Sequence, residues 1–84
     1  MTTLERLAAE QETAPSWKLA ARASREWSFT FYAGPEILDT CQHVTSPVRA
    51  LEIARVEWDN AKTQGCTRLT VELDGQIAHE LIAN

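Results

Sequence analysis

The spacing of apolar residues predicts a short helix at the start of the chain, over residues 2–12. Apolar side chains recur there every three or four residues, which is the period of a helix with one buried side. The residues that share this side are Leu4, Leu7, Ala8 and Gln11. Thr2 followed by Glu5 forms a capping box, in which each side chain binds the backbone N–H of the other residue. The segment TAPS at 13–16 ends this helix.

A different pattern, strict alternation of apolar and polar residues, predicts a strand at 26–33, EWSFTFYA, with three aromatic rings on one face. The turn residues of AGPE, 33–36, return the chain into a weaker strand at 37–44. Between the first helix and these strands, residues 16–25, SWKLAARASR, fit both a helix and a strand. Their alanines favour the helix.

A longer helix is predicted over residues 47–64. A hydroxyl residue followed by Pro47 is a strong start signal because proline fits the first helical turn. Gly65 suits the position just after the last turn. The side expected to cover a sheet carries Ala50, Leu51, Ala54, Trp58 and Ala61.

Ile53 and Val56 fall on a different side of this helix and also need a cover, since a one-sided helix would not place two β-branched apolar residues there. The N-terminal helix can supply that cover through Leu4 and Leu7. The alternative is a second copy of the chain or another protein, which would make Ile53 and Val56 an apolar contact surface.

The segment CTRLTVELDGQIAHEL predicts a β-hairpin around Asp74–Gly75. A two-residue turn would place polar residues opposite apolar ones along the ladder, whereas a three-residue loop at 73–75 separates the two faces and pairs Arg68 with Glu80. The inward pairs expected from this register are Val71–Ile77, Leu69–His79 and Thr67–Leu81. Because neighbours in a strand point to opposite faces, His79 and Glu80 cannot act together in catalysis.

Together these elements predict a small α+β domain in which an antiparallel sheet packs on one main helix. The order is an N-terminal helix followed by β-β-α-β-β. A chain of 84 residues is the size of a single domain, 1–84, with an N-terminal helix and linker at 1–15 and the β-β-α-β-β core at 26–83.

The charge of the chain is uneven. Twelve acids and eight bases give a net charge of −4, and residues 35–84 hold the whole excess. An acidic surface repels phosphate, which argues against general nucleic-acid binding and favours a basic protein partner. The acidic residues expected to contact such a partner are Glu36, Asp39, Glu52, Glu57, Asp59, Glu72 and Glu80.

Four residues are candidate metal ligands: Cys41, His43, Cys66 and His79. They would suit tetrahedral zinc if the second, third and fourth strands adjoined, but their spacing matches no standard zinc module. Catalysis by Cys41 with His43 as base lacks an orienting third residue, and the chain has no glycine-rich phosphate loop. We therefore expect no metal, no cofactor and no enzymatic activity.

The sequence also bears on where the protein works. The two cysteines lie 25 positions apart without a CxxC spacing, which is not a disulfide framework. The N-terminus has no apolar core of a signal peptide, and no apolar run approaches the roughly 18 residues of a membrane span. We expect a soluble cytoplasmic protein of a reducing compartment that does not bind membranes.

Small size, acidity and a lack of catalytic motifs are a profile that resembles inhibitors encoded by phages and mobile elements, including anti-CRISPR proteins. The expected function is a non-enzymatic protein-binding module that inhibits or regulates a larger machine by contacting a basic surface, such as that of a nucleic-acid-binding complex. One alternative is a nucleic-acid-binding accessory protein that uses a helical face of Lys18, Arg22 and Arg25. Another is a structural homodimer.

Overall fold

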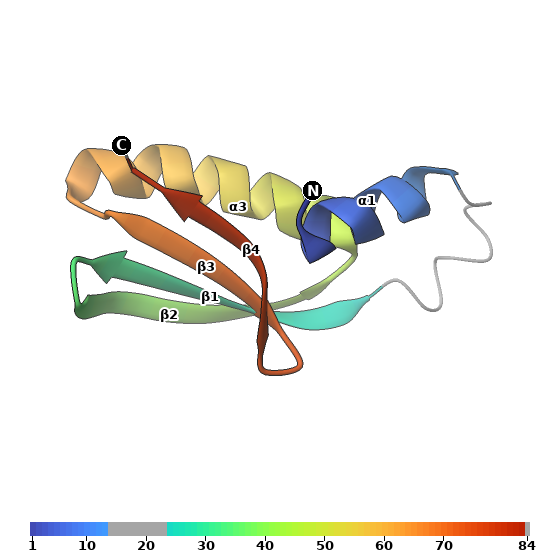
Figure 1. Cartoon of the computed structure of the whole chain (residues 1–84), viewed down its shortest axis with the longest axis horizontal. Helices are drawn as coiled ribbons and strands as arrows, with labels where there is room; N and C mark the ends of the chain where they lie inside the picture. Colours follow the sequence, from blue (N-terminus) through green and yellow to red (C-terminus); the bar gives the residue numbers. More distant parts are fainter. Residues whose placement is uncertain (14–23, 84) are drawn as a thin grey trace.

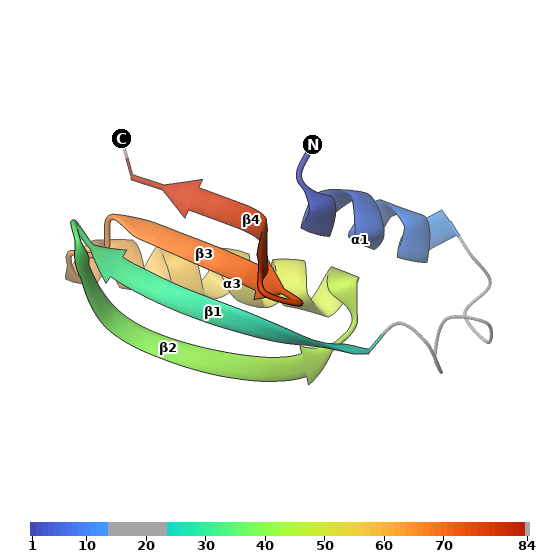
Figure 2. The same ribbon diagram turned by 60° about the horizontal axis from the view of Figure 1, so that its bottom comes forward.

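The computed structural model describes residues 1–13 and 24–83. Over these residues the chain forms an antiparallel four-stranded sheet in the order β2-β1-β3-β4, with helices on one face (Figure 1; Figure 2). The elements are helix α1 (Thr3–Thr13), strands β1 (Arg25–Ala33) and β2 (Glu36–Thr45), helix α3 (Pro47–Ala61), the 3₁₀ turn η1 (Lys62–Gln64), and strands β3 (Arg68–Leu73) and β4 (Gln76–Ile82). The predicted α+β architecture is confirmed.

The core lies between the sheet and α3. The aromatic rings of β1, Trp27, Phe29 and Phe31, are all buried, as their alternation predicts. Against them α3 presents Ala50 and Ala54, whose small side chains let the helix approach the sheet closely. The Trp27 indole N–H donates to the Thr45 carbonyl at 3.0 Å and so joins the start of β1 to the end of β2.

The start and end of α3 follow the sequence signals. The Ser46 hydroxyl accepts the backbone N–H of Arg49 at 3.3 Å, and Pro47 takes the first helical position, where its missing N–H costs nothing. The last turn tightens into η1, and Gly65, at φ 92°, makes the left-handed exit. No helix among the described residues is long and apolar enough to cross a membrane.

The predicted register of the second hairpin is wrong. Asp74 and Gly75 both have positive φ, 53° and 79°, which is the type I′ turn of a two-residue loop. A β-bulge at Ala78 then shifts the pairing by one residue, so that two residues of β4 oppose Glu72. Ala78 is 4% exposed and Ile77 is 54% exposed, the reverse of the expected orientation.

Beyond the bulge the faces separate as predicted. His79 pairs with Val71 and is buried on the inward face, while Glu80 pairs with Thr70 on the open face of the sheet. Arg68 therefore does not pair with Glu80: its guanidinium stacks on the Tyr32 ring, 4.2 Å from the centroid.

The helix expected at 16–25 falls almost entirely outside the described residues. Only its last two residues are described, and Arg25 is the first residue of β1. The N-terminal helix, by contrast, is confirmed as α1, with Leu4 and Ala8 buried.

Helix α1 packs beside α3, but not on the side of α3 that carries Ile53 and Val56. The Gln11 side-chain carbonyl accepts the Val48 backbone N–H at 3.0 Å. Helix α1 also contacts β4, whereas Val56 lines the hollow beside β2, the opposite edge of the sheet. Ile53 is half-buried against the core, while Val56 remains 66% exposed. The N-terminal helix is therefore not the cover for this pair.

A small polar cluster ties the first turn of α1 to β4. The Thr2 hydroxyl accepts the Glu5 N–H at 3.2 Å and the Glu5 carboxylate accepts the Thr2 N–H at 3.0 Å, which confirms the capping box. The same hydroxyl lies 2.8 Å from Nδ1 of His79, and a Glu5 carboxylate oxygen lies 4.0 Å from it. Burial lowers the pKa of His79, an effect that Glu5 opposes and Arg55 reinforces.

This cluster predicts a pH dependence of folding. A histidine with a lowered pKa in the folded state binds its proton more readily when unfolded, so stability is full above the ordinary value of about 6.5 and falls as the pH drops below it. Urea unfolding between pH 7.5 and pH 5 should show this loss, and His79→Gln should flatten it. The matched variant His43→Gln, on the opposite edge strand, should retain the slope. An unchanged slope in His79→Gln would contradict the assignment.

The open face of the sheet has one anomaly. Thr70 lies in its centre, paired with Thr30 and Glu80, and is only 1% exposed. Its hydroxyl has no hydrogen-bond partner among the described residues. A buried hydroxyl without a partner costs stability because it has lost its contact with water.

Thr70→Val should therefore stabilise the fold. The substitution keeps the β-branched shape and removes the unpaired hydroxyl, so the free energy of unfolding should rise by about 1 kcal/mol. Thr40→Val, two strands away in the same row but exposed, is the matched control and should change it by less than about 0.5 kcal/mol. Denaturant titration of the three proteins measures both, and a loss of stability in Thr70→Val would show that the hydroxyl is satisfied.

Candidate protein-binding groove

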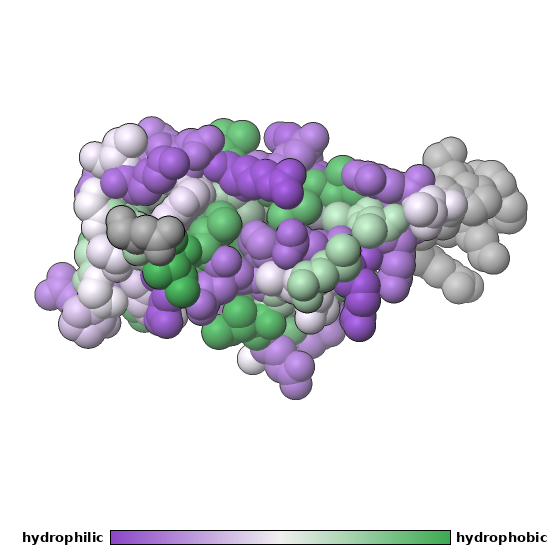
Figure 3. All heavy atoms as spheres, turned by 45° about the horizontal axis from the view of Figure 1, so that its top comes forward, coloured by the Kyte–Doolittle hydropathy of each residue, from purple (hydrophilic) through white to green (hydrophobic). Residues whose placement is uncertain are grey.

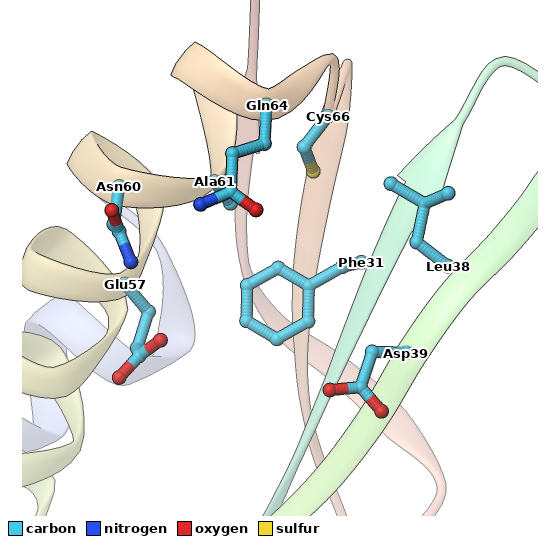
Figure 4. A pocket seen from close by; sticks show the side chains of 8 residues that line it. All are labelled: Phe31, Leu38, Asp39, Glu57, Asn60, Ala61, Gln64 and Cys66. Atoms are coloured by element: carbon cyan, nitrogen blue, oxygen red, sulfur yellow. The ribbon is translucent and has the colours of Figure 1, made fainter.

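A groove separates α3 from the edge strand β2. It consists of two adjoining hollows that share Glu57. The first, which we call the acidic hollow, has a volume of about 380 Å³ and is lined by Phe31, Leu38, Asp39, Glu57, Asn60, Ala61, Gln64 and Cys66 (Figure 4). The second, the valine hollow, has a volume of about 400 Å³ and is lined by His43, Val44, Thr45, Arg49, Ile53, Val56 and Glu57.

The acidic hollow brings together carboxylates from distant parts of the chain. Asp39 comes from β2 and Glu57 from α3, and Figure 4 shows both side chains on the rim around the Phe31 ring. The amide side chains of Asn60 and Gln64 complete the helix side. Among the described residues no lysine or arginine forms an ion pair with either carboxylate. The hollow therefore carries two uncompensated negative charges above an aromatic ring.

The other acidic residues named from the sequence are dispersed. On α3, Glu52 pairs with Arg49 at 2.9 Å and Asp59 pairs with Lys62 at 3.2 Å, so their charges are already matched. The remaining three lie elsewhere: Glu36 at the β1–β2 turn, and Glu72 and Glu80 on the open face of the sheet. Of the seven, only Asp39 and Glu57 meet in one hollow.

Ile53 and Val56, which lie off the sheet-covering side of α3, both line the valine hollow. Strand β2 contributes His43, Val44 and Thr45 to the same hollow, and Val56 is 66% exposed there. This arrangement was not visible in the sequence, because it depends on β2 being an edge strand and on α1 occupying the opposite flank of α3. The indication in the sequence was that Ile53 and Val56 fall on a different side of the helix from the residues expected to cover the sheet.

The apolar surface on the helix side of the molecule is scattered. Figure 3 shows this side, where hydrophobic residues form separate patches between hydrophilic ones.

Cys41 and His43 lie side by side on β2, and His43 lines the valine hollow. Their Sγ and Nε2 atoms are 3.8 Å apart, and the His43 ring stands edge-on to Phe29 with centroids 5.2 Å apart. Burial raises the pKa of the Cys41 thiol, and the carboxylates of Asp39 and Glu57 raise it further. A nucleophilic cysteine needs the opposite, a lowered pKa, so this environment disfavours thiolate chemistry.

The four candidate zinc ligands do not converge. Because β2 and β4 form opposite edges of the sheet, Cys41 and His43 are separated from His79 by two strands. Cys66 is buried and its thiol donates to the Arg68 carbonyl at 3.2 Å. Within residues 1–13 and 24–83, no three histidine, cysteine or acidic side chains are grouped as a metal site would require.

The alternative nucleic-acid face is also not assembled in the described part of the chain. Arg25 belongs to β1, and its guanidinium pairs with Asp74 at 2.6 Å. Lys18 and Arg22 lie outside the described residues.

The proximity of the carboxylates to Cys41 has a chemical consequence. Removing their charges with Asp39→Asn and Glu57→Gln should lower the pKa of the thiol and speed its alkylation by iodoacetamide at pH 8. A Cys66→Ala background isolates Cys41 as the reacting group. Glu52→Gln, on the same helix but outside the hollow, is the control and should leave the rate unchanged. Equal rates in all variants would show that the two charges do not reach the thiol.

Comparison with protein-family models, curated proteins and solved structures found no match to this chain. The proposal of function below therefore depends on the side chains of the groove.

Proposed function

We propose that the chain is a non-enzymatic protein-binding module that holds a basic side chain of another protein in the acidic hollow. The observation that carries the proposal is the convergence of Asp39 and Glu57, 18 positions apart in sequence, on one hollow without an ion-pair partner among the described residues. A lysine or arginine supplies the missing charge.

The lining of the hollow suits both the methylene groups and the charged end of a long basic side chain. Leu38 and Phe31 offer apolar surface to the methylene groups, which lysine and arginine bury readily. The two carboxylates then accept hydrogen bonds from the charged end, and the amide oxygens of Asn60 and Gln64 accept further ones. Hydrogen bonds to charged groups are the strong kind, so one anchored side chain makes a substantial contribution to binding.

The rest of the surface supports the same class of partner. The net charge of −4 attracts a basic protein from a distance and speeds encounter. A basic groove that normally holds nucleic acid is one surface with this chemistry, and a small acidic module seated there acts as an inhibitor by occupying it. This is how the module would regulate a larger nucleic-acid-handling machine.

The proposal is tested by selection from a displayed library of random twelve-residue peptides on the immobilised protein. Selected peptides should be rich in lysine or arginine flanked by apolar residues, and their affinity should fall as salt rises. Glu57→Arg should weaken binding about tenfold or more, because it places a positive charge where the anchor sits. Glu52→Arg makes the same charge change on the same helix outside the hollow, and should weaken binding less than about twofold.

Two outcomes would count against the proposal. Selected peptides without basic residues would remove the charge argument. Basic peptides that lose the same affinity in Glu52→Arg and Glu57→Arg would show that they follow net charge and do not use the hollow.

A further inference from the structure

We infer that β2 pairs in an antiparallel manner with β2 of a second copy of the chain, centred on Cys41, so that the grooves of the two copies join into one. The inference rests on the proposed function, because it names the second copy as the missing wall of that site. It starts from the state of β2, which is an edge strand of the described sheet, with one long side of its backbone unpaired by any strand of residues 1–13 and 24–83.

The composition of β2 permits such pairing. Exposed edge strands are commonly protected by lysine or proline, and the sequence of β2, EILDTCQHVT, contains neither. Its protective features lie at one end: a bulge beside Leu38 and the inward-facing charge of Asp39. The residues that follow, from Asp39 to Val44, form a regular strand. An inward charge blocks pairing unless the added strand brings a matching group.

A second β2 brings that group. Asp39, Cys41 and His43 all face α3, because they pair with Phe31, Phe29 and Trp27 of the buried face. A two-fold axis at Cys41 places Asp39 of one copy directly opposite His43 of the other, twice. On the other face the same axis sets Thr40 opposite Gln42, two polar side chains that can share a hydrogen bond.

Other registers lose this match. Moving the axis to Thr40 sets Asp39 opposite Cys41, and moving it to Gln42 sets Asp39 opposite Thr45. A shift by a single residue pairs inward side chains with outward ones. The axis at Cys41 is thus the register in which the inward charge meets an imidazole.

The pairing of two copies changes the shape of the binding groove as well as the mass of the particle. It makes one eight-stranded sheet from the described strands of two copies, with α3 and its counterpart on the same face. Helix α3 is centred on β1, with β2 and β3 contacted on either side, and the two β1 strands would be three strand spacings apart, about 14 Å. Two packed helices lie only about 8–10 Å apart, so a groove remains between them.

Each copy contributes the Glu57 carboxylate and an apolar pair, Ile53 and Val56, to this shared groove, and Asp39 lies at its floor opposite His43 of the other copy. The floor is the β2–β2 pair and the walls are the two α3 helices. An extended basic segment can then run along the groove and place side chains in both acidic hollows, which raises affinity through two linked contacts.

The oligomeric state is the first test. Light scattering coupled to gel filtration under reducing conditions, from about 10 µM to about 1 mM, should show a species of twice 9.4 kDa. Asp39→Lys sets lysine against His43, and His43→Glu sets glutamate against Asp39, so each should weaken the dimer about tenfold or more. The double variant sets lysine against glutamate and should restore it. Far-UV circular dichroism confirms that each variant is folded.

Crosslinking tests whether Cys41 of one copy lies opposite Cys41 of the other. Residues directly opposite in an antiparallel pair have Cα atoms about 4.5–5.5 Å apart, which is within the range of a disulfide. Diamide takes up the two thiol hydrogens and should join two copies through Cys41 in a Cys66→Ala background. The variant Cys41→Ser with Cys66 intact should stay uncrosslinked, because Cys66 is buried.

A monomer at every concentration would overturn the inference, as would a dimer that ignores Asp39→Lys and does not crosslink at Cys41. The two proposals fail separately. Glu57→Arg lies outside the paired strands, so it should weaken the capture of basic peptides about tenfold or more while leaving the dimer mass unchanged. A monomer that still selects basic peptides would remove the dimer and keep the binding function.

Discussion

The close contact between the alanine side of α3 and the aromatic side of β1 determines the shape of the whole molecule. Ala50 and Ala54 are fully buried against Trp27 and Phe29, and this contact supplies the centre of a small core. The helix is centred over β1 and contacts β2 and β3 on either side, so hollows remain between its flank and the edge strand β2. The groove along β2 is a direct result of that position, and so is the exposure of Val56 on its helix side.

Local sequence patterns account for most of the elements. The alternation in EWSFTFYA, the Ser46–Pro47 helix start and the Thr2–Glu5 capping box each describe contacts within a few residues, and each is present. The order of the strands is a different kind of information. It follows from the pairing of β1 with β3, which joins the β1–β2 and β3–β4 hairpins edge to edge in one sheet, and no local pattern specifies that pairing. The zinc hypothesis needed β2 near β4, and it failed on this point.

The candidate site was visible in the sequence only as separate parts. Asp39 and Glu57 were two of seven acids, and nothing in their spacing distinguished them from Glu52 or Asp59. What unites them is the gap between a helix and an edge strand, which depends on the flank that α1 takes. Ile53 and Val56 were the more informative residues. Because they lie away from the helix side that covers the sheet, they already indicated a second contact surface on this helix.

The hairpin error has a consequence for how this chain tolerates change. The turn at Asp74–Gly75 alone would give the ladder the wrong phase, and the extra residue at Ala78 corrects it before His79 enters the core. The count of residues between turn and core shows what a deletion would do: without one residue of 76–78 the ladder would run regularly from the turn, and His79 would still face Val71 while Glu80 faced Thr70. The end of β4 turns over only if the bulge straightens with all three residues in place, which would set His79 opposite Thr70 on the open face and Glu80 opposite Leu69 on the buried face.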